Sequence, residues 1–121
     1  MAEERLSFKE MCARFEVTPR TLRYYEYIEL LAPEREGRSR FYSPRDIARM
    51  TLIMRARRFG FSLEEVRQWL LLRDEEGDEA QMRALVDAAG RQLARLDQQI
   101  ADLQGARDDL AALRDEVAGS L

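Results

Sequence analysis

The sequence predicts a mainly helical protein, in which a small unit of four helices and one β-hairpin precedes a single long helix. Four segments begin with a residue type that caps helices, at Ser7, Thr18, Ser43 and Ser62. Proline and glycine punctuate residues 32–42, which predicts a short hairpin between the second and third helices. From Met82 onward, apolar residues recur at alternating steps of four and three, a spacing typical of a coiled coil.

The first two predicted helices are short and closely spaced. Ser7 and Glu10 form a capping box, and an apolar stripe follows at helical spacing up to Phe15, where this helix is expected to end, with members Phe8, Met11, Cys12 and Phe15. Thr18 caps the second helix, and Pro19 suits its first position. Two helices joined by only residues 16–18 fit a helix-turn-helix, in which the first turn of the second helix reaches base edges or phosphates.

The hairpin and the next two helices complete this unit. Residues 32–42 contain three arginines, Arg35, Arg38 and Arg40, so the predicted hairpin would form a wing that lies along a phosphate backbone. The third helix begins at Ser43–Pro44 and stops at Gly60, with Ile47, Met50 and Met54 facing inward. The capping box Ser62–Glu65 opens the fourth helix, whose inward stripe is Leu63, Val66 and Leu70 with Trp69 beside it.

The charge of the chain is unevenly distributed. The net charge of −3 combines a front part, residues 1–73, with 15 basic and 11 acidic residues and a tail, residues 74–121, with 5 basic and 12 acidic residues. Nineteen of the twenty basic residues are arginine, and Lys9 is the only lysine. Because guanidinium groups bind phosphate and guanine in a bidentate manner, the basic front favours nucleic acid as a partner.

Composition excludes several classes of function. Histidine is absent and Cys12 is the only cysteine, so one chain cannot build a His/Cys metal cluster, an iron–sulfur centre, a disulfide or a Ser–His–Asp triad. No cofactor and no enzymatic activity are expected, and Cys12 is interpreted as a core thiol rather than a redox sensor. The chain has no apolar run long enough for a bilayer and no signal core, so no membrane partner and a cytoplasmic location are expected.

The heptad pattern predicts a dimerisation surface. Its members are Met82, Val86, Ala89, Leu93, Leu96, Ile100 and Leu103. The predicted organisation is a first domain at 1–73, a linker at 74–79 and a coiled-coil helix at 80–121. A narrow apolar stripe needs a partner, and a second copy of the chain is the economical one, although the helix could instead fold back on its own domain. The pattern shifts at Gly105 to Ala106, Leu110, Leu113 and Val117, which predicts a bend or break there.

Three segments carry a family resemblance. They are TPRTLRYYEYIELL at 18–31, APEREGRSRFYSPRDI at 32–47 and RRFGFSLEEVRQWL at 57–70. Together they resemble the MerR family of bacterial transcription regulators. The resemblance implies a winged helix-turn-helix DNA-binding domain, followed by a long antiparallel coiled-coil dimerisation helix. It further implies a homodimer that binds a pseudo-palindromic operator in an over-long spacer between the −35 and −10 promoter elements. Bending and untwisting the DNA would then let RNA polymerase engage both elements.

The resemblance also implies which side chains meet the DNA. The recognition helix would contribute Thr18, Arg20, Thr21 and Arg23, with Tyr24 and Tyr25 contacting phosphate or bracing the helix. The first wing would contribute Arg38, Arg40 and Tyr42, and the second wing Arg57, Arg58 and Ser62. Tyr25 could equally be a core aromatic, and Arg45 and Arg49 are interpreted as a solvated face. Glu29 stands where the family often has glycine, which predicts a slightly different end of the recognition helix.

The resemblance bears on effectors as well. Metal-sensing members carry cysteines near the dimer helix and drug-sensing members a large ligand domain, so neither kind of sensing is expected here. Three segments are similar to those of a subgroup of regulators that control branched-chain amino-acid and fatty-acid catabolism: RFYSPRDI, RRFGFSLEEVRQ and LL. This similarity implies an acyl-CoA or a related metabolite as effector. A constitutive repressor and a small pocket near the dimer helix stay open, and so does a protein-interaction module that uses the coiled coil.

Overall fold

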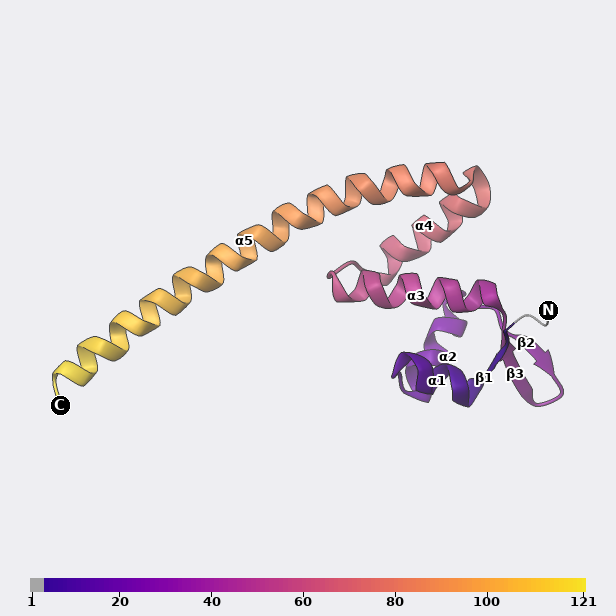
Figure 1. Ribbon diagram of the computed structural model, residues 1–121, viewed down its shortest axis with the longest axis horizontal. Helices are drawn as coiled ribbons and strands as arrows, with labels where there is room; N and C mark the ends of the chain where they lie inside the picture. The colour runs from indigo at the N-terminus through magenta and orange to yellow at the C-terminus, as the bar shows by residue number, and fades with distance from the viewer. Residues whose placement is uncertain (1–3) are drawn as a thin grey trace. The chain divides into compact units, whose positions relative to one another are not determined.

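The computed structural model describes residues 4–121, so the first three residues of the predicted domain 1–73 lie outside the described part. The chain divides into two compact units, one ending at Met82 and the other spanning Arg83–Leu121. In chain order (Figure 1) the described residues form β1 (Leu6–Ser7), α1 (Phe8–Phe15), α2 (Pro19–Tyr27), β2 (Glu34–Glu36), β3 (Ser39–Tyr42), α3 (Pro44–Arg58), α4 (Leu63–Glu76) and α5 (Asp78–Gly119). None of the described helices is both long enough and apolar enough to cross a membrane.

Side chains cap the four helices where the sequence predicts them to begin. Ser7 and Ser62 form complete capping boxes with Glu10 and Glu65, in which each serine accepts from the glutamate's amide and each glutamate accepts from the serine's amide. Thr18 and Ser43 accept from the amides of Thr21 and Asp46 and precede a proline at the first helical position. These bonds satisfy amide groups that the first helical turn leaves without partners, which confirms the predicted starts.

The wing belongs to a three-stranded antiparallel sheet rather than to a hairpin alone. Strands β2 and β3 pair as the sequence predicts, with Arg35 opposite Arg40. The strand β1, which the sequence analysis did not foresee, pairs with the other edge of β3 and places Leu6 opposite Tyr42. The N-terminal segment therefore anchors the wing to the helical core.

The core of the first unit lies between the helices and the inner face of this sheet. Its fully buried large side chains come from α1 to α4, β3 and the segment after α2, and they are Met11, Leu22, Leu30, Tyr42, Met50, Ile53 and Val66. The loop between α3 and α4 adds Phe61, whose ring packs edge-on against Trp69 at a centroid distance of 4.8 Å. On α3 the structure buries Ile53 fully and the predicted Met54 only partly.

The turn that follows α2 differs from the one predicted from the sequence. Glu29 has φ +63°, the left-handed conformation that a glycine would adopt, so the prediction of a different helix end is wrong. The carbonyl of Tyr25 accepts from the amides of both Leu30 (2.9 Å) and Leu31 (3.4 Å), and both leucines are buried. This burial and bonding offset a left-handed residue's cost of about 1–2 kcal/mol.

The connection between α4 and α5 is shorter than the predicted linker 74–79. Residues 74–76 continue α4 and residues 78–79 begin α5, so Gly77 alone lies between them. Gly77 has φ +91° and ψ −179°, which an L residue adopts only with strain. Its amide donates to the carbonyl of Arg73 (2.9 Å), and Arg73 Nε donates to Asp78 Oδ1 (2.7 Å) across the turn. Gln81 Nε2 then donates to the carbonyl of Trp69 (3.0 Å) and fixes the first turns of α5.

Helix α5 runs for 42 residues without interruption. The predicted break at Gly105 is absent, because the helical hydrogen bonds continue through this residue. A glycine inside a helix costs only about 1 kcal/mol relative to alanine, and the strong helix formers on either side outweigh that cost.

Candidate nucleic-acid interface

The start of α2 presents the residues predicted to read DNA. Arg20 and Arg23 are exposed, and Thr21 is half-buried. The Thr18 hydroxyl accepts from the amide of Thr21 (3.1 Å) and donates to the Thr21 hydroxyl (3.0 Å). The threonine pair therefore holds the first turn of the helix, while both arginine side chains remain accessible on its surface.

A cationic groove joins α2 to the wing and to the start of α1. Two guanidinium groups lie over the ring of Phe8, with the Cζ of Arg23 at 5.8 Å and the Cζ of Arg40 at 5.3 Å from its centroid. The groove has a volume of about 350 Å³ and is lined by Ser7, Phe8, Lys9, Arg23, Arg38, Ser39, Arg40 and Phe41. Four of these eight side chains are cationic and none is acidic, so the groove attracts a polyanion.

Sequence reasoning missed Phe8 and Lys9 as parts of this groove. It assigned Phe8 to the apolar stripe of the first helix, whereas the structure leaves its ring half-buried under the two arginines. The available signal was the position of both residues in the first turn of a helix that precedes the predicted reader, but no spacing rule places that turn beside the wing.

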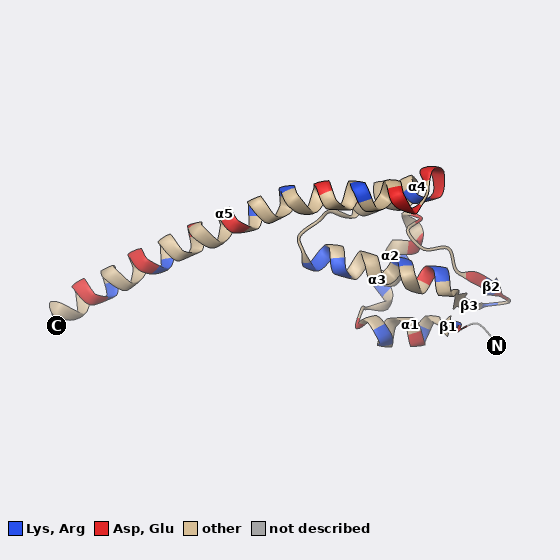
Figure 2. Cartoon of the chain, turned by 45° about the horizontal axis from the view of Figure 1, so that its top comes forward, with Lys and Arg blue, Asp and Glu red and all other residues tan. Residues whose placement is uncertain are grey.

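The wing carries Arg38 beside its turn, and Arg5 contacts both of its strands. Gly37, with φ +62°, forms the turn, and Arg38 is exposed next to it. Arg5 lies over the ring of Phe41 at 4.4 Å and donates to Glu36 Oε1 at 2.8 Å. Figure 2 shows that acidic residues also occupy β2, so the basic side of the wing is β3 and its turn.

Two predicted contact residues lie in the core instead of on the surface. Tyr25 and Tyr42 are both buried: Tyr25 is the core aromatic that the sequence left open, whereas the burial of Tyr42 contradicts the surface position implied for it. The Tyr42 hydroxyl donates to Glu26 Oε1 at 3.0 Å, and the same carboxylate oxygen lies 3.6 Å from Arg40 Nε. Burial, followed by the hydrogen bond to Glu26 and its charge, raises the pKa of Tyr42 well above its usual range. Tyr42 thus positions Glu26 and, through it, Arg40.

The remaining predicted residues are on the surface. Tyr24 is about half exposed, with its ring 6.4 Å from that of Tyr25. Arg57 and Arg58 are exposed at the end of α3, where the second wing begins, and Ser62 is the N-cap of α4. The backbone of this wing turns at Gly60, with φ +92°, just after the end of α3, as the sequence predicts for a glycine that follows a helix.

Cys12 is half-buried in α1. Burial raises the pKa of its thiol, partly opposed by the nearby charge of Arg23. A raised pKa lowers the thiolate fraction and hence the reactivity of a cysteine. Within residues 4–121, no three His, Cys, Asp or Glu side chains gather into a group that could hold a metal ion.

Comparisons with known proteins agree on one family. Residues 6–72 match the MerR HTH family regulatory protein, and residues 47–113 match a second family described as MerR, DNA binding. The HTH-type transcriptional regulator ZntR of Escherichia coli K12 is 36% identical over 115 residues, which cover 92% of this chain and 79% of ZntR.

Solved structures agree with this fold. A MerR family transcriptional regulator from Bacillus cereus has a TM-score of 0.67 and 29% identity, with 88% of this chain and 79% of that chain covered. HiNmlR, a MerR family regulator lacking the sensor domain and bound to promoter DNA, has a TM-score of 0.67 and 20% identity, with 87% and 80% covered. The matched family consists of transcription regulators and not of enzymes. The chain therefore belongs to the MerR family and is a DNA-binding transcriptional regulator.

Proposed function

We propose that the chain acts as a homodimer that binds a pseudo-palindromic operator in an over-long −35/−10 promoter spacer. In this proposal the dimer regulates transcription by bending and untwisting the DNA, which changes how RNA polymerase engages the promoter. The carrying observation is the cationic surface that α2, the wing and the start of α1 share, with Arg23 and Arg40 stacked on Phe8. A promoter-binding protein must be located in the compartment that contains the DNA, so the proposed location is cytoplasmic.

The proposed DNA contacts follow from exposure and charge. Arg20 and Arg23 lie where a recognition helix meets the major groove, and Arg38 and Arg40 lie on the wing. The surface residues that complete the proposed set are Thr18, Thr21, Tyr24, Arg57, Arg58 and Ser62. Because each phosphate contact releases counterions, the logarithm of affinity should fall steeply with the logarithm of salt concentration.

The proposed dimer forms through the apolar seam of α5. Five of its residues are more than half exposed in the single chain, at 54–71%: Met82, Val86, Leu93, Ile100 and Leu103. Ala89 is also exposed and Leu96 is half-buried. Burying a leucine side chain contributes about 1.5–3 kcal/mol, so a row of this length favours association with a second copy. The family resemblance supports an antiparallel arrangement.

A footprint of the purified protein on its own upstream DNA tests the proposed mechanism. We expect protection of a near-palindrome inside a spacer longer than usual, with enhanced cleavage at its centre where the DNA is distorted. Protection over the −10 element or the start site would contradict distortion and indicate steric repression. No protection at low salt would contradict autonomous operator binding and favour the coiled coil as a protein-interaction module.

A charge placed in the seam tests the dimer. Leu96→Asp would put two carboxylates into the apolar interface, so we expect monomers in analytical ultracentrifugation and loss of binding to a two-half-site duplex. Ala94→Asp, which adds the same charge at an exposed position outside the seam, is the matched control and should leave the dimer intact. If the Leu96→Asp variant remained a dimer, this would contradict dimerisation through the apolar seam of α5.

A further inference from the structure

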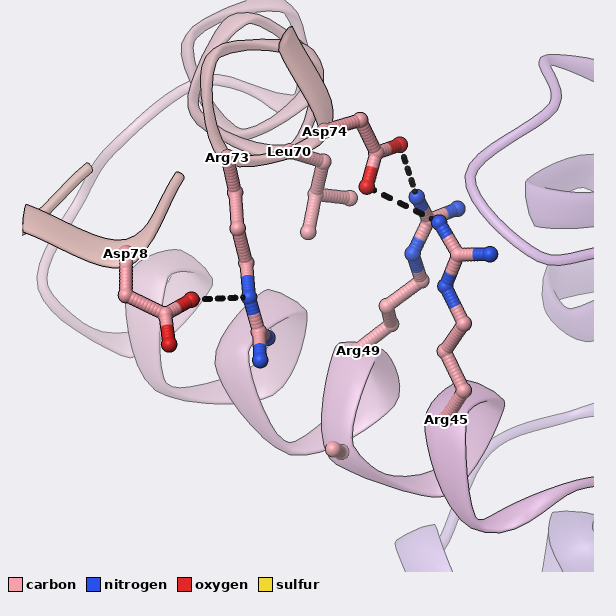
Figure 3. A pocket seen from close by; sticks show the side chains of 7 residues that line it. Arg45, Arg49, Leu70, Arg73, Asp74 and Asp78 are labelled. Atoms are coloured by element: carbon pink, nitrogen blue, oxygen red, sulfur yellow. Dashed lines mark hydrogen bonds and ion pairs between the residues drawn. The ribbon is translucent and has the colours of Figure 1, made fainter. Parts of the chain in front are cut away.

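Helices α3 and α4 and the first residue of α5 enclose a cavity away from the DNA-facing groove. Its volume is about 450 Å³, within the usual range for sites that hold small molecules, and it is lined by Arg45, Ala48, Arg49, Leu70, Arg73, Asp74 and Asp78 (Figure 3). Three arginines and two aspartates leave its lining with a net positive charge. The cavity uses none of the residues assigned to DNA contact.

Two of the arginines already hold a carboxylate. Arg45 Nη2 donates to Asp74 Oδ1 and Arg49 Nη2 donates to Asp74 Oδ2, both at 2.9 Å. Arg49 Nη1 also donates to the carbonyl of Leu30 at 3.4 Å, and its side chain is only 14% exposed, so it is not the solvated residue that the sequence predicts. The pair therefore presents one donor to each oxygen of a planar oxyanion, and the Asp74 carboxylate occupies that position in this structure.

The third arginine supplies donors that the described residues, 4–121, do not use. Arg73 extends from α4 toward α3, on the other side of Leu70 from Arg45 and Arg49 in the view of Figure 3. Its Nε donates to Asp78 Oδ1 at 2.7 Å, and within residues 4–121 Asp78 is its only side-chain partner. The terminal nitrogens of Arg73 are thus available to an acceptor inside the cavity.

We propose that this cavity binds a small free oxyanion, the phosphate or carboxylate group of a metabolite, through Arg45, Arg49 and Arg73. Guanidinium groups bind both anions through paired hydrogen bonds. A phosphate of duplex DNA offers the same chemistry, but the segment that contributes Asp74 and Asp78 to the lining is strongly acidic, since residues 74–79 read DEEGDE. That charge repels a polyanion more strongly than a small anion.

In this proposal Asp74 acts as an internal competitor of the anion. The anion competes with the Asp74 carboxylate for Arg45 and Arg49, so binding exchanges an internal tie between α3 and α4 for a ligand. It also draws on Arg73, which bridges to Asp78 across Gly77. Occupancy therefore alters the contacts on both sides of the junction between α4 and α5.

Titration of the full chain with inorganic phosphate, and separately with acetate, tests this site without DNA. Amide and arginine Nε signals followed by nuclear magnetic resonance should shift saturably at positions 45, 49 and 73. Arg73→Gln removes a charged donor without touching the Asp74 tie, and should weaken binding about tenfold. Asp74→Asn removes the internal competitor and should tighten it. Arg38→Gln, in the DNA-facing groove, is the matched control and should leave the affinity of the cavity unchanged.

Several outcomes would overturn the proposal. They are an absence of saturable shifts with both anions, shifts confined to the groove around Arg38, or an affinity that Arg73→Gln leaves unchanged. A folded Asp74→Asn variant that binds no tighter would contradict competition by Asp74. An operator-binding measurement separates the two sources of phosphate, because a free anion requires that Arg73→Gln leave duplex affinity unchanged. An equal loss of duplex affinity would assign the site to DNA.

Discussion

Replacing Tyr42 by phenylalanine isolates one buried hydrogen bond. The Tyr42 ring is fully buried, so the substitution keeps the packing of the core and removes only the hydroxyl that donates to Glu26 at 3.0 Å. The Glu26 side chain is 12% exposed and therefore keeps little water to replace the lost donor. Arg40 Nε, at 3.6 Å from the same oxygen, remains as a weaker partner.

The expected loss follows from that geometry. A hydrogen bond to a charged group contributes about 1.5–3 kcal/mol, and the remaining Arg40 places the expected loss near the middle, at about 2 kcal/mol. For a chain of this size, such a loss lowers Tm by roughly 8 °C. Because Arg40 also loses a fixed carboxylate position, operator affinity should fall modestly as the wing becomes less ordered.

Thermal and urea unfolding at one fixed protein concentration measure this effect, since the proposed dimerisation would make Tm depend on concentration. Tyr27→Phe is the matched control, because Tyr27 is 86% exposed and its hydroxyl is in solvent, so it should change stability by less than about 0.5 kcal/mol. A Tyr42→Phe variant as stable as the wild type would refute the assigned role of the Tyr42–Glu26 bond.

Three further predictions concern pH, recognition and the junction between α4 and α5. The pKa of Tyr42 is raised when the chain is folded, so its stabilising contribution is complete below about pH 10 and is lost as the pH rises further, by up to about 1.4 kcal/mol per pH unit. The free energy of unfolding, measured from pH 9 to pH 12, should therefore fall less steeply with pH in Tyr42→Phe than in the wild type. Identical slopes in the two proteins would contradict this. Arg23→Ala should cost about 1–3 kcal/mol of specific operator binding in gel shifts, whereas the control Arg114→Ala, on the outer part of α5, should cost nothing. Unchanged affinity in Arg23→Ala would remove α2 from the reading role. Gly77→Ala should cost about 1–3 kcal/mol in urea unfolding through backbone strain alone, because no atom lies within 4 Å of the added Cβ, and a neutral effect would show that α4 and α5 can join in another conformation.

Local chemistry made most of the fold predictable from the sequence. Each helix start depends on a cap and a residue three positions later, as in Ser7 with Glu10, and such pairs can be read directly. The hairpin also follows from nearby residues, since Gly37 sits at its turn. The basic character of the first unit can be predicted from its charge alone. The seam of α5 can be predicted from the periodicity of its apolar residues.

Long-range pairing explains what the sequence could not reveal. In an isolated two-stranded wing Tyr42 would be exposed and could meet DNA, but β1 pairs along the other edge of β3 and turns the Leu6–Tyr42 pair toward the core. A strand of two residues is too short to show a recognisable alternation of apolar and polar residues, so its pairing could not be predicted. The meeting of Phe8 with Arg23 and Arg40, and of Arg49 with Asp74, likewise depends on helices whose packing no local motif specifies.

The predominance of arginine on the proposed DNA-facing surface makes its charge largely independent of physiological pH. The guanidinium group is a permanent cation at physiological pH, and histidine, the side chain that commonly acts as a switch near neutral pH, is absent from the chain. Acetylation can neutralise only Lys9, since it is the one lysine. Affinity for DNA therefore cannot be adjusted by discharging the arginines of this face. Apart from a change at Lys9, it can be adjusted by changing the ionic strength or by moving the arginines relative to one another.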